Sequence, residues 1–225
     1  VWNQKEKFAY LCPHWNLKLE KGTVLPVICY TNCEDAELFV NGRSFGMKSK
    51  GFPCYGMTER YGHFDRYRRP ANTDDLFLSW DVPYEPGKIE VVGYYDGKEV
   101  CRYNVETTGE AASIKLTVDK TSVDADGRSI VQAEVRIVDS EGHLVFDACP
   151  ELNFTLEGDG EIIGIDNGDP ACHEQWKETK GRHAFNGMAY AVIRAGQNKG
   201  ELTLTVQASG VDAAIGKASV TISQK

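Results

Sequence analysis

Hydrophobic alternation with a period of two residues runs through this chain and constrains its fold more than any other feature. Apolar and polar residues alternate in segments such as residues 36–40, 88–95 and 130–138. This alternation turns one face of a segment toward a core and the other toward solvent, as in a half-buried β-strand. No βαβ pattern and no amphipathic stretch longer than a helical turn or two interrupts it. The sequence therefore predicts an all-β fold.

Two pairs of strand-like segments are joined by dipeptides typical of β-hairpins. Residues 41–42 are Asn-Gly and follow residues 36–40, and residues 96–97 are Asp-Gly and follow residues 88–95. Both dipeptides adopt positive φ at low cost, which a type I′ turn requires. We therefore predict two hairpins within a first part of the chain that is β throughout.

Length and a break in the pattern predict two domains. The chain has 225 residues, more than most single cores need, and the small polar run TTGEAA at residues 107–112 interrupts the alternation. We expect domains at residues 1–108 and 109–225. Short strands separated by turns are typical of an immunoglobulin-like sandwich, so we predict two consecutive immunoglobulin-like β-sandwich domains. The second part contains seven strand-like segments: residues 114–118, 130–138, 152–156, 161–165, 184–193, 201–208 and 213–222.

The charge of the chain argues against nucleic acid as a partner. Asp and Glu number 33 against 25 Lys and Arg, and the net charge of -8 repels polyphosphate. We interpret the arginines of the aromatic run at residues 60–69 as pairing with nearby carboxylates. No stretch approaches the roughly 18 consecutive apolar residues of a membrane helix, so we expect no membrane partner. The chain opens with Val1 rather than Met, which we interpret as a processed or partial chain.

The cysteines do not follow a metal-binding pattern. There are seven, an odd number, and no two have CxxC spacing, which argues against a zinc ribbon. Small buried thiols are the favoured interpretation, and one or two disulfides are the alternative.

Motifs for catalysis and for metal binding are each incomplete. His173-Glu174 begins like HExxH, but the residue four beyond His173 is Lys177. Residues 124–127 and 166–169 space carboxylates as a calcium loop does, yet the closing Glu is missing and β-turns explain them. No GxSxG, P-loop or GxGxxG is present. We predict no catalytic residue, no metal ligand and no cofactor in this chain.

Residues 49–75 form the most informative irregular stretch. They are rich in Gly, Tyr, Arg and Pro and show little periodicity. Loops of this length inside a compact domain are uncommon and are usually functional or ordered by a partner.

Five runs carry a resemblance to a known family. They are LCPHWNL at residues 11–17, VICYTNCEDAELFVNGRSFG at 27–46, WDVPYEPG at 80–87, IGIDNGDPACHE at 163–174 and AFNGMA at 184–189. The first three resemble the segment that follows the catalytic barrel in bacterial glycoside hydrolase family 2 β-galactosidases. The last two are similar to the immunoglobulin-like C-terminal domain of the same enzymes. Leu17, where the family often has Trp, and residues 60–69, which do not align, depart from the pattern.

The resemblance implies a part of a glycosidase rather than the whole enzyme. In family 2 the acid/base and nucleophile glutamates lie in a TIM barrel, which precedes these segments and needs about 250 residues of its own. It implies non-catalytic accessory domains of an enzyme that hydrolyses O-glycosyl bonds in carbohydrate metabolism. Such domains would pack on the barrel of the parent chain, shape the rim of its active site or build an oligomer. It also implies an exported parent, periplasmic or extracellular.

An autonomous carbohydrate-binding module is the alternative function. It would use exposed aromatic rings as platforms for sugars of the galactoside type, although aromatic residues in a β-sandwich more often lie in the core or at a domain interface. An adhesin repeat fits less well because the two halves share no common period. The candidates for carbohydrate contact or for the barrel interface are Trp15, Tyr55, Tyr61, Tyr67 and Trp176.

Overall fold

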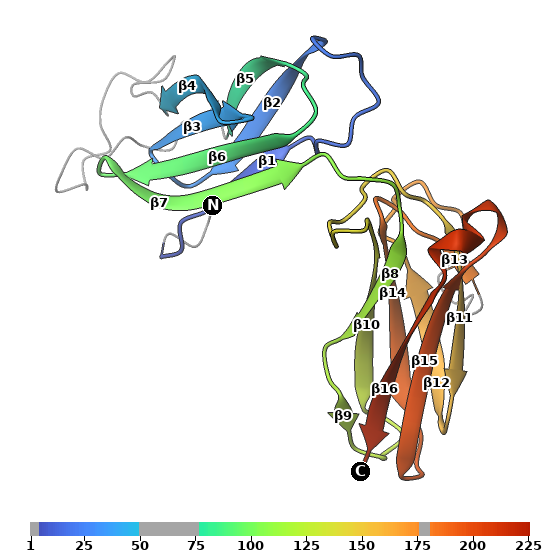
Figure 1. The fold of residues 1–225 in the computed structure, drawn as a ribbon. Coiled ribbons are helices and arrows are strands. Elements are labelled where there is room, and N and C mark those ends of the chain that lie inside the picture. Colours follow the sequence, from blue (N-terminus) through green and yellow to red (C-terminus); the bar gives the residue numbers. More distant parts are fainter. Residues whose placement is uncertain (1–4, 50–76, 176–180) are drawn as a thin grey trace. The chain divides into compact units, whose positions relative to one another are not determined.

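The computed structural model describes residues 5–49, 77–175 and 181–225, and the regular elements within them are β-strands apart from one short 3₁₀ helix (Figure 1). The predicted all-β fold is confirmed. The chain divides into two compact units, Val1–Thr107 and Thr108–Lys225. Most of the irregular stretch at residues 49–75 lies outside the described residues. In the described part of the chain, no helix is long and apolar enough to cross a membrane.

The first unit contains two antiparallel sheets. Their strand orders are β1-β2-β5 and β4-β3-β6-β7. The strands are β1 Ala9–Cys12, β2 Val24–Thr31, β3 Asp35–Val40, β4 Arg43–Ser49, β5 Phe77–Pro83, β6 Lys88–Tyr95 and β7 Lys98–Glu106. The larger sheet contains both predicted hairpins, β3–β4 and β6–β7.

The hairpin turns adopt the backbone conformation that their sequences predict. Asn41 and Gly42 have φ of 49° and 79°, and Asp96 and Gly97 have φ of 50° and 72°. Positive φ at both central residues matches the right-handed twist of the flanking strands.

Alternating side chains of the two sheets form the core of the first unit. Val27 of β2, Leu38 of β3 and Ile89 of β6 are buried. Trp80 of β5 is buried as well, and its indole Nε1 donates a hydrogen bond to the Gly46 carbonyl in β4 at 3.0 Å. Because Trp80 and Gly46 belong to different sheets, this bond ties the two layers together.

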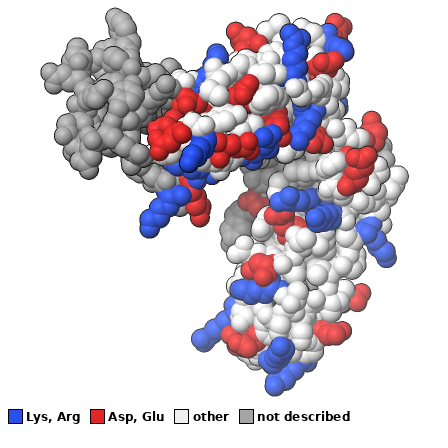
Figure 2. All heavy atoms as spheres, turned by 60° about the vertical axis from the view of Figure 1, so that its left-hand side comes forward, with Lys and Arg blue, Asp and Glu red and all other residues white. Residues whose placement is uncertain are grey.

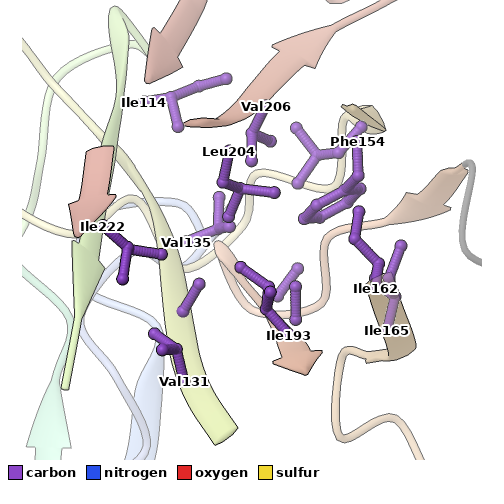
Figure 3. Packing of buried hydrophobic residues seen from close by; sticks show 14 of the residues in the cluster. Ile114, Val131, Val135, Phe154, Ile162, Ile165, Ile193, Leu204, Val206 and Ile222 are labelled. Carbon is purple, nitrogen blue, oxygen red and sulfur yellow. The ribbon is translucent and has the colours of Figure 1, made fainter. Parts of the chain in front are cut away.

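The second unit is a β-sandwich of two larger sheets. Their strand orders are β12-β14-β10-β8 and β13-β11-β15-β16-β9. The strands are β8 Ser113–Val118, β9 Ser122–Val123, β10 Ile130–Val138, β11 Glu151–Glu157, β12 Gly160–Asp166, β13 Gly181–His183, β14 Met188–Ala195, β15 Gly200–Ala208 and β16 Lys217–Gln224. Figure 3 shows Val135 and Ile193 of one sheet packed with Leu204 and Ile222 of the other in one buried cluster.

Two of the predicted strands differ from the structure. The segment at 184–193 is divided, because Asn186 and Gly187 have φ of 51° and 74° and make a turn before β14. The segment at 213–222 begins later than predicted, because the 3₁₀ helix η1, Gly210–Ile215, occupies its start. Gly216 ends this helix at φ 84°, and β16 follows it.

Candidate functional site

The outer face of the β1–β2–β5 sheet is mostly apolar. In β2 the inward side chains Val27 and Cys29 are buried, as alternation predicts. A sheet face turned to water normally carries polar residues at the outward positions. Most outward positions of this sheet are instead apolar: Tyr10 from β1, Val24, Pro26, Ile28 and Tyr30 from β2, and Phe77 and Pro83 from β5. We call these seven residues the apolar face.

Strand register places three aromatic rings of the apolar face in one row. Tyr10 pairs with Tyr30 across the β1–β2 ladder, and Tyr30 pairs with Phe77 across the β2–β5 ladder. The ring centroids of Tyr30 and Phe77 are 6.0 Å apart in an edge-on arrangement. Tyr103 of β7 extends the row, with its ring centroid 5.2 Å from that of Tyr10.

Two of these rings are exposed within the described part of the chain, and Phe77 is half-buried. Tyr10 is 51% exposed and Tyr30 is 40% exposed. Among the outward positions of β5, two carry polar side chains, Ser79 and Asp81. Contiguous exposed apolar surface on a soluble domain marks an interaction site more often than isolated exposed residues do.

The outer face of the β4-β3-β6-β7 sheet has the opposite character. Arg102 of β7 lies 2.6 Å from the carboxylate of Glu90 and 3.0 Å from that of Glu99, and Lys88 lies 3.0 Å from Glu90. Burial would raise the pKa of Glu90, but Lys88 and Arg102 hold it below its ordinary value. Figure 2 shows acidic and basic side chains intermingled on the face that it draws. In the first unit, the outer face of the β4-β3-β6-β7 sheet is therefore suited to contact with water, and the outer face of the β1-β2-β5 sheet is suited to contact with a partner.

Trp15, which the sequence analysis names as a candidate for sugar contact, belongs to the core. Its exposed fraction is 0%, and its ring packs against Tyr84 at a centroid distance of 5.2 Å. Its indole Nε1 donates a hydrogen bond to the Glu85 carbonyl at 2.9 Å. No face of the ring is free to stack on a sugar or on another domain, so that prediction is wrong for Trp15. The other four candidates, Tyr55, Tyr61, Tyr67 and Trp176, lie outside the described residues.

Sequence reasoning missed the apolar face, although β2 carries a signal for it. Residues 24–30, VLPVICY, contain no charged residue and almost no polar one. A strand buried on both faces has a near-continuous apolar run, whereas a strand with one wet face alternates. The run therefore indicates that both faces of β2 are suited to burial.

In the two turns that resemble calcium loops, Asp carboxylates accept hydrogen bonds from backbone N–H groups of the same turn. The Asp126 carboxylate accepts hydrogen bonds from the backbone N–H groups of Arg128 and Ser129 at 2.8 and 2.7 Å. The Asp166 carboxylate accepts them from Asn167 and Gly168 at 2.7 and 3.0 Å. Among the described residues no group of three or more His, Cys, Asp and Glu could hold a metal ion.

A buried arginine holds the end of the family-like run at residues 163–174. The Arg182 guanidinium donates from Nη2 to the Glu174 carbonyl at 3.0 Å and from Nη1 to the Cys172 sulfur at 3.6 Å. The Glu174 side chain lies 2.9 Å from His183 Nδ1, and this hydrogen bond lowers the pKa of Glu174 below its ordinary value. These contacts fix the segment to β13, which is a structural role.

Comparisons with known proteins match both units. Residues 114–216 match the family described as glycoside hydrolase family 2 C-terminal domain 5, and residues 22–101 match a domain of unknown function, DUF4982. A β-galactosidase of Bacteroides ovatus is 34% identical over 97% of this chain. A putative β-glucuronidase of Formosa agariphila is 30% identical over 86% of it. The crystal structure of a glycosyl hydrolase family 2 member from Bacteroides cellulosilyticus covers 98% of the chain at 27% identity, with a TM-score of 0.81.

The matched relatives are much longer than this chain. The chain spans 23% of the Bacteroides ovatus protein, 17% of the Formosa agariphila protein and 29% of the Bacteroides cellulosilyticus structure. Both units are matched, and they follow each other in the order that the family-like runs predict. The chain therefore belongs to the C-terminal region of glycoside hydrolase family 2 proteins.

Proposed function

We propose that this chain supplies the non-catalytic accessory domains of a family 2 glycosidase, and that the apolar face of its first unit packs against the catalytic barrel of the longer protein. The observation that carries the proposal is the row formed by the exposed Tyr10 and Tyr30 and the half-buried Phe77, on a sheet most of whose outward positions are apolar. Burying such a face releases ordered water over a broad area and stabilises the assembly.

The length of the relatives supports the barrel as the occupant of this face. More than three quarters of the Bacteroides ovatus β-galactosidase lies outside the matched region, whose share is 23%. A family 2 barrel is large enough to supply the facing surface, since a (β/α)₈ barrel takes about 250 residues. The ion-paired outer face of the other sheet would then remain in contact with water.

The test uses the upstream region of the longer protein and residues 1–225 as two separate polypeptides. We expect them to form a complex, and we expect the double variant Tyr10→Ser with Tyr30→Ser to weaken it at least about tenfold, because buried aromatic anchors carry much of an interface's binding energy. Tyr190→Ser is the matched control, since this tyrosine of the second unit is also partly exposed, at 38%. The readout is the dissociation constant from titration calorimetry.

Two outcomes would contradict the proposal. One is a complex whose dissociation constant is the same for the double variant and for the unchanged chain. The other is the absence of a complex together with binding of a galactan by the unchanged chain that the double variant loses. The second outcome would support an autonomous carbohydrate-binding module.

We also propose a parent enzyme of the β-galactosidase type. The relative named β-galactosidase supports this at 34% identity, against 30% for the putative β-glucuronidase. Turnover of nitrophenyl β-galactoside and nitrophenyl β-glucuronide by the longer protein discriminates the two substrates. A higher kcat/KM for the glucuronide would overturn this part of the proposal.

An exported parent, periplasmic or extracellular, is the last part of the proposal. It rests on the family resemblance alone. Fractionation of cells that express the natural gene, followed by immunodetection, tests it, and recovery of the protein with cytoplasmic markers would contradict it.

A further inference from the structure

Two cysteines of the first unit lie side by side although 68 residues separate them in the sequence. The Sγ atoms of Cys33, in the turn between β2 and β3, and Cys101, in β7, are 3.5 Å apart. Cys33 is buried, with 2% of its surface exposed, and Cys101 is partly exposed. Both are thiols in the structure.

Gly93 of β6 makes this approach sterically feasible. It is the register partner of Cys101 in the β6–β7 ladder. A Cβ atom at Gly93 would lie 2.6 Å from the Cys101 sulfur and 2.7 Å from the Cys33 sulfur, closer than real Cβ contacts. The two sulfurs therefore occupy the space that a side chain at this position would fill.

The backbone around each cysteine is held in place independently of the sulfurs. The Cys33 N–H donates to the Thr31 hydroxyl at 2.9 Å, and the N–H of Glu34 donates to the Tyr94 carbonyl at 3.0 Å. Cys101 lies inside the β6–β7 ladder. Since both chain segments are fixed to β6 or its neighbours, the thiols stay within reach of each other.

We propose that Cys33 and Cys101 form an intramolecular disulfide when the chain meets a disulfide oxidant. Cys101 is the more accessible thiol, so its thiolate attacks a sulfur of the oxidant and releases one oxidant thiolate, which takes up a proton. The Cys33 thiolate then attacks the Cys101 sulfur of the mixed disulfide and releases the second oxidant thiolate. The two cysteines lose two protons and two electrons, and the oxidant is reduced to two thiols.

The environment of Cys101 sets the rate of this reaction. Burial raises the pKa of Cys101 to about 12, and the neighbouring Cys33 thiol adds to the shift. Because the thiolate is the nucleophile, the first step is slow at neutral pH and accelerates as the pH rises.

The bond would link an edge strand covalently to the rest of the first unit. β7 lies at one edge of its sheet, and Cys33 precedes β3. A cross-link between residues far apart in sequence restricts the unfolded chain more than a local one does, so it raises the resistance to unfolding.

The experiment compares the reduced chain with the chain oxidised by glutathione disulfide at alkaline pH. We expect the oxidised chain to lose at least two thiols that react with Ellman's reagent under denaturing conditions, and the joined peptide pair to be two hydrogen masses lighter than its two reduced peptides. Proteolysis without reductant should release one peptide pair joined through Cys33 and Cys101. The urea midpoint should rise on oxidation, and dithiothreitol should reverse all of these changes.

Variants distinguish this pair from other pairings. Cys101→Ser and Cys33→Ser should each abolish the joined peptide, whereas Cys149→Ser, at an exposed position in the second unit, should retain it. The peptide map of the unchanged chain decides the result even if a variant fails to fold. An unchanged thiol count after oxidation, or a bond that joins another pair such as Cys29 and Cys33, would overturn the proposal.

Discussion

Tyr10 and Tyr30 lie directly opposite each other in the β1–β2 ladder, and both side chains project from the outer face of their sheet. Their neighbours along the strands, Leu11 and Cys29, point inward and are buried. The pair therefore contributes little to the core of the isolated chain, and its apolar surface is available to a partner.

The first prediction separates the stability of the isolated chain from its interactions. The double variant Tyr10→Ser with Tyr30→Ser should change the free energy of unfolding by at most about 1 kcal/mol, since exposed cross-strand pairs contribute only tenths to one kcal/mol. Leu38→Ala, at a buried position, should cost about 2–5 kcal/mol. Urea denaturation followed by circular dichroism measures both. If the tyrosine variant lost as much free energy of unfolding as Leu38→Ala, these rings would be shown to stabilise the fold instead.

The second prediction concerns Trp15. Trp15→Phe should lower the free energy of unfolding by about 1–3 kcal/mol, because the Glu85 carbonyl loses its indole donor and the smaller ring leaves a gap beside Tyr84. The conservative change Tyr190→Phe, at a partly exposed site, is the control. The measurement is the urea midpoint, and an unchanged midpoint for Trp15→Phe would contradict the structural role.

The third prediction concerns the pH dependence of the second unit. Asp139 is buried, and its carboxylate accepts backbone N–H bonds from Gly109, Glu141 and His143. Burial would raise the pKa of Asp139, but these three donors, with the nearby His143 side chain, hold it below its ordinary value of 3.8.

Because the pKa of Asp139 is lower in the folded chain, its stabilising effect is complete above the ordinary value of 3.8 and is lost as the pH falls through the lower folded value. Asp139→Asn should therefore reduce the urea midpoint at pH 7. The difference in urea midpoint between this variant and the unchanged chain should narrow as the pH falls below the ordinary Asp pKa of 3.8. A gap that stays constant down to pH 2 would contradict the assignment.

The fourth prediction is that residues 108–225 fold alone. The buried cluster of this unit draws its residues from both sheets of the sandwich and lies entirely within residues 114–222. A core of this kind is sufficient for a domain of its size to fold independently. Circular dichroism in urea should give one cooperative transition for this piece. A broad, non-cooperative change would mean that the unit depends on the rest of the chain.

The fifth prediction is that residues 1–225 hydrolyse neither nitrophenyl β-galactoside nor nitrophenyl β-glucuronide above background. Retaining cleavage needs two carboxyl groups about 5–5.5 Å apart that flank the scissile bond. The carboxylates described above instead cap turns or form ion pairs. Activity that survives repurification and follows the protein concentration would contradict this prediction.

The sequence by itself determined the local features of this protein. Asn41-Gly42 and Asp96-Gly97 adopt positive φ and close the predicted hairpins, because the preference lies in the residues themselves. Period-two alternation likewise predicted strands such as β10, Ile130–Val138, whose bounds match the prediction. The Asn186-Gly187 turn carries the same local signal, although it lies inside the segment 184–193 that alternation predicts as one strand.

Only the tertiary structure decided which side chains meet. The sequence pattern does not indicate which side of a sheet Tyr10 and Tyr30 face, or which residues cover Trp15. Packing buried Trp15 against Tyr84 and left Tyr10 and Tyr30 exposed. The approach of Cys33 to Cys101 depends on the order of β3, β6 and β7 in one sheet. Contacts between residues so far apart in sequence arise from sheet order and layer packing, which the period of a strand does not encode.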